Sequence, residues 1–350
     1  MPEGGGLFHG RRAVSIENRE LRVTVLVEGG HIAEVRHKRT GISPLWVPNW
    51  PSIEPSAFDA SMHAEYGGGV DARLLAGIMG HNWCLDIFGG PSPDEAAAGL
   101  TPHGEASIAR YDVDANASCL AMAAVLPLAQ LRIDRRLELI DSTVRVSESV
   151  ENLMAFDRPI AWTQHVTLGP PFLQKGATQF RACATRSKVF ESTFGAADYL
   201  VADAEFEWPH APALDGGTED LQLFTGRTAS SGYTAHLMNP AETHAFFVAF
   251  SPASTLAFGY VWKQSEFPWM GIWEENHSRA MKPWSGAALT RGMEFGVSPM
   301  PESRRQMIDR GTLFGVPAYR WLPARTTIAA EYWIRTWCAS EIPEALEWPA

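Results

Sequence analysis

Residues 21–36 read Leu-Arg-Val-Thr-Val-Leu-Val-Glu-Gly-Gly-His-Ile-Ala-Glu-Val-Arg, and this stretch decides the fold class. Apolar and polar residues alternate on both sides of the Gly29-Gly30 pair. Successive side chains of a strand point to opposite faces, so this alternation indicates strands with one buried face. Two such strands separated by paired glycines predict a β-hairpin.

The same pattern continues along the chain, with turn signals between the segments. Further strands are predicted over 131–134, 137–140, 144–150, 158–168, 245–250, 256–263, 269–275 and 327–337. Helix signals are short: a capping-box pattern begins at Ser92 and stops at Gly99, and a second candidate lies between Pro301 and Gly311. We therefore predict an all-β fold, a large antiparallel β-sandwich with a few short helices in its loops.

No internal repeat, low-complexity segment or linker divides the sequence. The Pro- and Gly-rich stretches at 41–56, 66–69, 89–104 and 208–217 are typical of loops. We expect a single domain over residues 1–350, with residues 1–14 as a loose N-terminal tail.

Composition limits the partners. The chain has 29 basic and 40 acidic side chains, a formal net charge of −11, and no local Lys/Arg cluster, which argues against nucleic acid. Most of the 13 Trp, 17 Phe and 7 Tyr residues are accounted for by core packing. Exposed Trp also stacks on the apolar faces of sugar rings, so the aromatic content favours a carbohydrate partner.

The sequence predicts a cytoplasmic protein without a membrane segment. Its first residues lack the apolar core of a signal peptide, and no run of about 18 apolar residues is present. The cysteines are far apart and form no C-x-x-C motif, which is typical of reduced thiols: Cys84, Cys119, Cys183 and Cys338.

No motif calls for a metal or a cofactor. The 11 histidines are scattered, and none has the i, i+4 or H-E-x-x-H spacing of a helical metal site. The run Tyr66-Gly67-Gly68-Gly69 lacks the Lys-Ser/Thr of a phosphate-binding loop. Residues distant in sequence still meet in a β-fold, so this pattern leaves a metal unsupported rather than excluded.

Two histidines lie in segments suited to chemistry. His103 precedes Gly104 in a Gly/Pro-rich loop, where it either faces a ligand or caps a turn. His165 shares a strand face with Thr163 and Thr167, and this polar face lines either a wet cavity or an ordinary packed interior.

A third segment runs from Phe267 to Pro299 and carries acids beside tryptophans. Glu275 ends a predicted strand, whereas Glu294 is flanked by Met, Phe and glycines. Burial of such a carboxylate raises its pKa and improves it as a base. The alternative is that these acids are solvated or pair with Arg279 and Arg291.

In their joint order, several segments resemble the galactose mutarotase-like (aldose 1-epimerase) superfamily. The segments are the 21–35 hairpin with Lys38–Gly41 and Leu45-Trp46, His103-Gly104, Val150–Leu153 followed by His165, and Trp321–Ala324 leading into 326–337. After His165 the chain has Val-Thr-Leu-Gly-Pro-Pro-Phe, where the family has an aromatic residue and an Asn.

The resemblance implies interconversion of sugar anomers without a cofactor. It gives His165 as the acid that protonates the ring oxygen, Glu294 as the base, Glu275 as its rival, and His103 as a helper. The expected partner is a small sugar, and the oligomeric state is left open. The candidate substrate-binding residues are Arg73, His81, Asp86, Trp162, Gln164, Trp273, Glu275, Asn276 and Trp284.

Two other functions use the same residues. A sugar-binding or sensor protein would keep Trp162, Trp273 and Trp284 as stacking platforms and need no acid–base pair. A glycoside hydrolase or lyase on a related sandwich would use two carboxylates such as Glu275 and Glu294.

Overall fold

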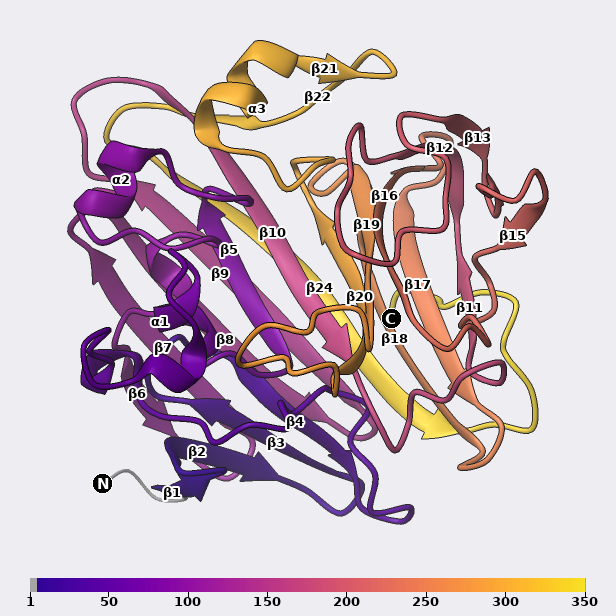
Figure 1. Ribbon diagram of the computed structural model, residues 1–350. Helices are drawn as coiled ribbons and strands as arrows, with labels where there is room; N and C mark the ends of the chain where they lie inside the picture. The colour runs from indigo at the N-terminus through magenta and orange to yellow at the C-terminus, as the bar shows by residue number, and fades with distance from the viewer. Residues whose placement is uncertain (1–4, 350) are drawn as a thin grey trace.

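The computed structural model describes residues 5–349 and consists mainly of two large antiparallel sheets packed face to face (Figure 1). One sheet has 12 strands in the order β1-β2-β3-β4-β5-β10-β20-β19-β16-β12-β13, with β23 paired to β10. The other has eight strands in the order β11-β17-β18-β24-β9-β8-β7-β6. The all-β sandwich predicted from the sequence is confirmed.

The strands of the 12-stranded sheet are β1 (Gly5–Phe8), β2 (Arg11–Glu17), β3 (Leu21–Leu26), β4 (Ile32–His37), β5 (His81–Asp86), β10 (Arg158–Leu168), β12 (Ala184–Val189), β13 (Glu205–Glu207), β16 (Ser230–Met238), β19 (Trp269–Asn276), β20 (Leu289–Gly296) and β23 (Arg320–Leu322). Those of the eight-stranded sheet are β6 (Asp112–Ala115), β7 (Cys119–Leu126), β8 (Leu131–Ile140), β9 (Thr143–Asn152), β11 (Gln179–Ala182), β17 (His244–Ser251), β18 (Leu256–Lys263) and β24 (Thr327–Cys338). Two small hairpins are β14 (His210–Pro212) with β15 (Thr218–Asp220) and β21 (Thr312–Leu313) with β22 (Val316–Pro317).

The helices are short and lie in connections, as the sequence predicted. They are α1 (Ala72–Leu75), α2 (Pro93–Ala97), α3 (Arg304–Arg310) and the 3₁₀ turns η1 (Pro55–Ala57), η2 (Ala64–Tyr66) and η3 (Glu105–Ser107). The expected capping box at Ser92 is present, and Ser303 makes a second one at the start of α3. No helix within residues 5–349 has the length and apolar character needed to cross a membrane.

The expectation of a loose N-terminal tail over residues 1–14 is wrong from Gly5 onward. Strand β1 pairs with β2, and β2 pairs with β3, so this segment extends one edge of the larger sheet. Val14 is buried in the main core, which explains why β2 is held in place. Residues 1–4 lie outside the described part of the chain.

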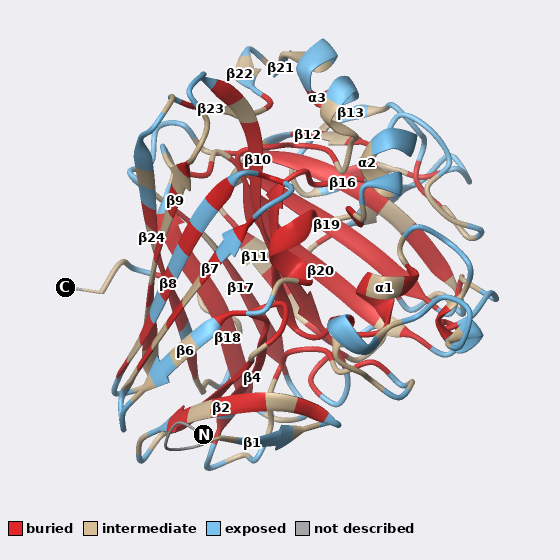
Figure 2. Ribbon diagram, turned by 90° about the vertical axis from the view of Figure 1, so that its left-hand side faces the viewer, coloured by how far each residue is buried: buried red, intermediate tan, exposed pale blue. Residues whose placement is uncertain are grey.

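The two sheets differ in how their outer faces are covered. Strand β8 alternates between buried residues and exposed or half-buried ones, so the outer face of the smaller sheet meets solvent. The central strands of the larger sheet are buried on both faces (Figure 2). Loops and short helices cover its outer face, where Leu74 and Phe88 pack in one cluster with Trp269 and Trp273. This covered outer face holds the candidate site.

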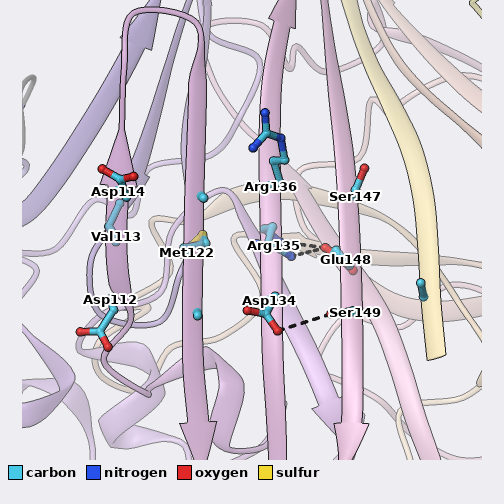
Figure 3. Close-up of a pocket in the computed structure, with 13 residues that line it drawn as sticks. Asp112, Val113, Asp114, Met122, Asp134, Arg135, Arg136, Ser147, Glu148 and Ser149 are labelled. Carbon is cyan, nitrogen blue, oxygen red and sulfur yellow. Dashed lines mark hydrogen bonds and ion pairs between the residues drawn. The ribbon is translucent and has the colours of Figure 1, made fainter. Parts of the chain in front are cut away.

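A buried carboxylate joins the two sheets. Glu148 on β9 forms an ion pair with Arg135 on β8, with 2.7 Å between Oε1 and Nη2, and Figure 3 draws this pair. The other oxygen of Glu148 accepts hydrogen bonds from Trp162 Nε1 at 3.1 Å and Gln164 Nε2 at 2.6 Å, both on β10 of the larger sheet. Tyr332 donates to Oε1 at 2.9 Å. Both oxygens of this buried carboxylate therefore have hydrogen-bond partners, as a buried charge requires.

The hairpin predicted over residues 21–36 is confirmed and depends on its glycines. Gly29 and Gly30 have φ of 78° and 62°, a conformation that other residues rarely adopt. A Cβ atom on Gly29 would lie 2.5 Å from the Ser107 carbonyl oxygen. Arg135 also donates to the Gly30 carbonyl at 2.9 Å, so the turn is tied to the buried ion pair.

We predict that Glu148→Ala lowers the free energy of unfolding by about 3–5 kcal/mol, because it leaves Arg135 as an uncompensated buried charge. Replacing both residues by apolar ones of similar size, Arg135→Met with Glu148→Leu, costs less than the single change. Arg136→Ala, on the exposed face of the same strand, serves as the control and stays close to wild type. Urea unfolding measures all of them, and a Glu148→Ala curve that overlays the wild type contradicts the prediction.

Candidate active site

Strand β10 supplies the central residue of the site through its alternation. Its odd-numbered residues Thr163, His165 and Thr167 face outward from the sandwich, whereas Trp162 and Val166 lie in the core between the sheets. This is the polar face that the sequence predicted, and the covering loops make its environment enclosed.

Neighbouring strands bring two further groups beside His165. In the register of β5 with β10, Asn82 is opposite His165. On the other side of β10, the pairing of Gln164 with Phe295 places Glu294 of β20 next to His165. The Nε2 atom of His165 lies 3.0 Å from Oε1 of Glu294.

The Glu294 carboxylate is buried, and one of its oxygens makes no hydrogen bond to the described residues. Its side chain is 2% exposed, and Oε2 has no hydrogen-bond partner among the described residues. Gly292 lies on the same strand face, where an added Cβ would approach Oε1 to 2.8 Å. A larger residue at position 292 would therefore push on the carboxylate, and the glycine leaves it room.

His103 reaches the same place from the loop before η3. The next residue, Gly104, has φ of 73°, and a Cβ there would lie 2.1 Å from the Leu85 carbonyl oxygen. This close approach brings the loop against β5 and sets the rings of His103 and His165 4.5 Å apart between centroids. Burial lowers the pKa of His103 well below its usual value, and the nearby His165 and His31 lower it further, so His103 is neutral near pH 7.

These groups line one cavity of about 250 Å³ over the outer face of the larger sheet. Its lining is mostly apolar and aromatic, with a few polar groups: Asp71, Leu74, Leu75, Ile78, Phe88, Gly89, Gly90, Pro102, His103, His165, Phe194, Tyr233, Trp273, Arg279, Trp284, Glu294 and Pro301. Such a mixture is typical of a small-molecule site, and the size suits a single ring. The predicted residues His103, His165, Glu294, Trp273 and Trp284 are therefore brought together.

Three predicted substrate-binding residues do not line this cavity. Trp162 and Gln164 occupy even-numbered positions of β10, so their side chains point between the sheets to Glu148. His81 is fully buried and contacts Gln164 Oε1 at 2.9 Å and the Tyr260 hydroxyl at 3.1 Å. For Trp162 and Gln164 the strand period explains this placement, because residues an odd number of positions from His165 face the opposite side of the sheet.

Arg73 and Asp86 are also outside the cavity. Arg73 Nε donates to the Pro55 carbonyl at 3.0 Å and holds a covering loop. Asp86 is buried and pairs with Arg158 and with both terminal nitrogens of Arg304, at 2.7 and 2.8 Å for the latter. Asp86 therefore anchors helix α3 to the sheet.

Glu275 and Asn276 do not line the cavity; Glu275 holds the β19–β20 loop, and Asn276 binds the start of β16. Glu275 accepts from the backbone N–H and the hydroxyl of Ser278, at 2.7 and 2.6 Å, and from the backbone N–H of Arg279 at 3.0 Å. Asn276 Nδ2 donates to Ser230 Oγ at 3.0 Å. The acids of this segment thus differ in role, and only Glu294 reaches the cavity.

Two residues of the site were not predicted as such. Asn82 contacts both histidines but lies on a strand without alternation, because β5 is buried on both faces. Arg279 lies over the rings of Trp273 and Trp284, with its Cζ 5.7 and 4.9 Å from their centroids. The position of Arg279 between two tryptophans in the sequence was the available signal.

A larger hollow of about 560 Å³ lies elsewhere, on the outer face of the eight-stranded sheet (Figure 3). It runs over β6 to β9, where small residues such as Ala121 and Ala123 leave a shallow trough. Several of its charged side chains have partners of their own: Asp134 accepts from Ser149 at 3.5 Å. Arg136 donates to Glu138 at 2.9 Å. None of the described lining residues forms an acid–base pair directed into it, so we place the site at His165.

Within residues 5–349, no group of three or more His, Cys, Asp or Glu side chains is arranged to hold a metal ion. The four cysteines are free thiols.

Comparisons with known proteins agree with this architecture. No protein-family model matches the sequence, and no curated protein matches it either. Solved structures do match, among them a proposed aldose 1-epimerase from Klebsiella pneumoniae, with a TM-score of 0.67 at 14% identity over 94% of this chain and 80% of that one. A galactose mutarotase related enzyme from Lactobacillus acidophilus matches with a TM-score of 0.60 at 14% identity, over 95% of this chain and 99% of that one. A proposed aldose 1-epimerase from Escherichia coli K12 matches with a TM-score of 0.61 at 13% identity, over 94% of this chain and 100% of that one.

The chain has the galactose mutarotase-like fold. At these identities the likeness concerns the fold, and the residues of the cavity carry the argument on chemistry.

A buried neutral histidine, His31, supports the site and makes the stability of the fold depend on pH. His31 contacts the Ser107 carbonyl through Nε2 at 2.9 Å and accepts from the Met79 backbone N–H at 3.3 Å, so it braces the segment that follows His103. Burial lowers the pKa of His31 to about 3, with Arg11 adding to the effect. The unfolded chain binds a proton at this residue below about pH 6.5, whereas the folded protein does not until about pH 3.

We predict that the free energy of unfolding falls as the pH drops below about 6.5, and that His31 accounts for about 2 kcal/mol of this loss at pH 5. In His31→Gln the difference in stability between pH 7.5 and pH 5 becomes smaller by that amount. His9→Gln, at an exposed position, is the matched control and keeps the wild-type difference. Urea titrations at the two pH values measure this difference in stability. A His31→Gln variant that keeps the wild-type difference contradicts the assignment.

Proposed function

We propose that this protein is a carbohydrate-active enzyme that interconverts the anomers of an aldose by general acid–base catalysis. The observation that carries the proposal is the contact of His165 Nε2 with Glu294 Oε1 at 3.0 Å on the wall of a cavity lined by tryptophans. The likeness to structures described as aldose 1-epimerases and galactose mutarotase related enzymes supports the same class.

The reaction requires an acid and a base side by side. In a cyclic aldose the anomeric hydroxyl and the ring oxygen are bonded to the same carbon, C1. Glu294 removes the proton of the anomeric hydroxyl, the electrons of that O–H bond form the C1 carbonyl, and the C1–ring oxygen bond breaks. The ring oxygen takes a proton from His165 in its doubly protonated form, which is left as neutral imidazole. Rotation about C1–C2 and the reverse steps then give the other anomer, and both side chains regain their starting states.

The geometry of the pair suits this chemistry. The two groups that exchange protons with atoms on one carbon must be close neighbours, and His165 and Glu294 are in contact. Glu294 Oε2 has no partner among the described residues, so it is available to the anomeric hydroxyl. Glu275 was the rival base, but its oxygens bind Ser278 and Arg279. We therefore assign the base to Glu294.

The rest of the cavity suits a sugar ring. Trp273 and Trp284 offer aromatic surface to the apolar face of a ring, and Trp273 lies 5.7 Å from His165 between ring centroids. Arg279 lies on these two rings and is a donor for sugar hydroxyls. The glycoside-cleaving alternative is weaker, because its second carboxylate, Glu275, does not line the cavity.

We predict that Glu294→Gln and His165→Gln each slow anomer exchange by about 10²–10⁴-fold, the usual contribution of a general acid or base. Polarimetry after dissolving one pure anomer measures the rate, with a panel of aldoses used to find a substrate. Glu294→Gln keeps the size of the side chain and removes its basicity, so circular dichroism is expected to match the wild type.

Asp134→Asn, in the trough of the outer sheet, is the control and retains the wild-type rate. A wild-type rate in Glu294→Gln or His165→Gln removes that residue from the mechanism. Sugar binding detected by calorimetry without any acceleration of exchange favours the sugar-binding or sensor function instead.

A further inference from the structure

We propose that Asn82 is a positioning residue that fixes which nitrogen of His103 and of His165 carries the proton. The side-chain amide of Asn82 lies between the two rings and touches the Nδ1 atom of each. Its Oδ1 is 2.9 Å from His103 Nδ1, and its Nδ2 is 3.4 Å from His165 Nδ1. Asn82 is fully buried on β5, directly opposite His165.

The amide dictates the tautomer of His103. An amide oxygen only accepts hydrogen bonds, so Nδ1 of His103 must carry the proton that it receives. A neutral imidazole has a single N–H, and therefore Nε2 of His103 presents a lone pair. The lowered pKa of His103, caused by burial and by His165 and His31, agrees with a neutral ring.

The same amide dictates the opposite arrangement at His165. The NH₂ group only donates, so Nδ1 of His165 must present its lone pair. The Thr167 hydroxyl, 3.1 Å from the same nitrogen, is placed to donate a second hydrogen bond. The proton of neutral His165 is then on Nε2, where it points to Glu294 Oε1 at 3.0 Å.

The reverse orientation of the amide is disfavoured for neutral His165. With Oδ1 turned to His165, Nδ1 would need the proton, and the bare Nε2 would face the Glu294 carboxylate. The Cys84 thiol lies 3.8 Å from Asn82 Oδ1 and donates to it in the observed orientation. Burial raises the pKa of Cys84 well above its usual value, so the thiol keeps its proton.

This assignment separates the roles of the two histidines. His165 offers an N–H to the cavity and His103 offers an acceptor, so His103 binds a sugar hydroxyl and delivers no proton to the ring oxygen. The separation of roles rests on the function proposed above, whereas the tautomer assignment does not.

The groups that surround the His165 ring come from several elements. They are Glu294 on β20, Asn82 on β5, Thr167 on β10, Trp273 on β19 and His103 before η3, with Asp71 and Arg279 also on the cavity wall and Cys84 in contact with Asn82. Asn82 contacts both histidines at Nδ1, so replacing its donor by an oxygen changes the partner of His165 and keeps an acceptor for His103.

The test is a long-range ¹H–¹⁵N spectrum of the full chain with ¹⁵N-labelled histidine, assigned with His103→Gln and His165→Gln. The wild type is expected to show neutral His103 protonated at Nδ1 and neutral His165 protonated at Nε2. This measurement needs neither a substrate nor a variant of Asn82. Neutral His165 protonated at Nδ1, or neutral His103 protonated at Nε2, overturns the proposal.

Asn82→Asp replaces the donor by an acceptor oxygen, so neutral His165 is expected to carry its proton on Nδ1 instead of Nε2. Anomer exchange is expected to slow by about 100-fold, because the tautomer with its proton on Nδ1 leaves the reacting nitrogen Nε2 without one. Thr163→Val, on the same face of β10 and with an unpaired hydroxyl, is the control and leaves both tautomers unchanged. An Asn82→Asp spectrum identical to the wild type contradicts the proposal. The expected tautomers without any exchange activity in the wild type support the role of Asn82 and contradict the proposed function.

Discussion

The buried carboxylate of Glu148 is the interaction on which the rest of the structure depends. It pairs with Arg135 within the smaller sheet and binds Trp162 and Gln164 across the sandwich. These contacts fix which residues of β10 face inward. Because side chains alternate along a strand, they also fix that His165 faces outward. A slip of one residue would satisfy neither the carboxylate nor the cavity, so the packing of the sandwich and the geometry of the site have one cause.

The outward face becomes a site because other segments enclose it. A histidine and a carboxylate on an open sheet would be solvated, whereas here loops and short helices cover the face and leave a cavity of about 250 Å³. Strand pairing places Glu294 beside His165, and the tight contact of Gly104 with β5 brings in His103. The Asn82 amide completes the arrangement by giving each histidine a different proton position. Exclusion of water strengthens the interactions of these few polar groups.

Local sequence patterns predicted much of the fold and part of the site. Alternation and paired glycines identified the hairpin at Gly29, and strand β10 was predicted with its observed bounds. Asn82 was missed because β5 is buried on both faces and carries no alternating signal. Gln164 was misplaced although the strand period already separates it from His165. The distinct roles of Glu275 and Glu294 depend on loop contacts that no local pattern encodes.

The proposed activity of this pocket is to accelerate the exchange of sugar anomers. The most direct measurement is two-dimensional ¹³C exchange spectroscopy on an aldose labelled at C1, with increasing amounts of the wild-type protein. We expect cross-peaks between the two anomers whose exchange rate rises in proportion to protein concentration. Saturable binding of the same sugar, with exchange no faster than in buffer, would contradict it.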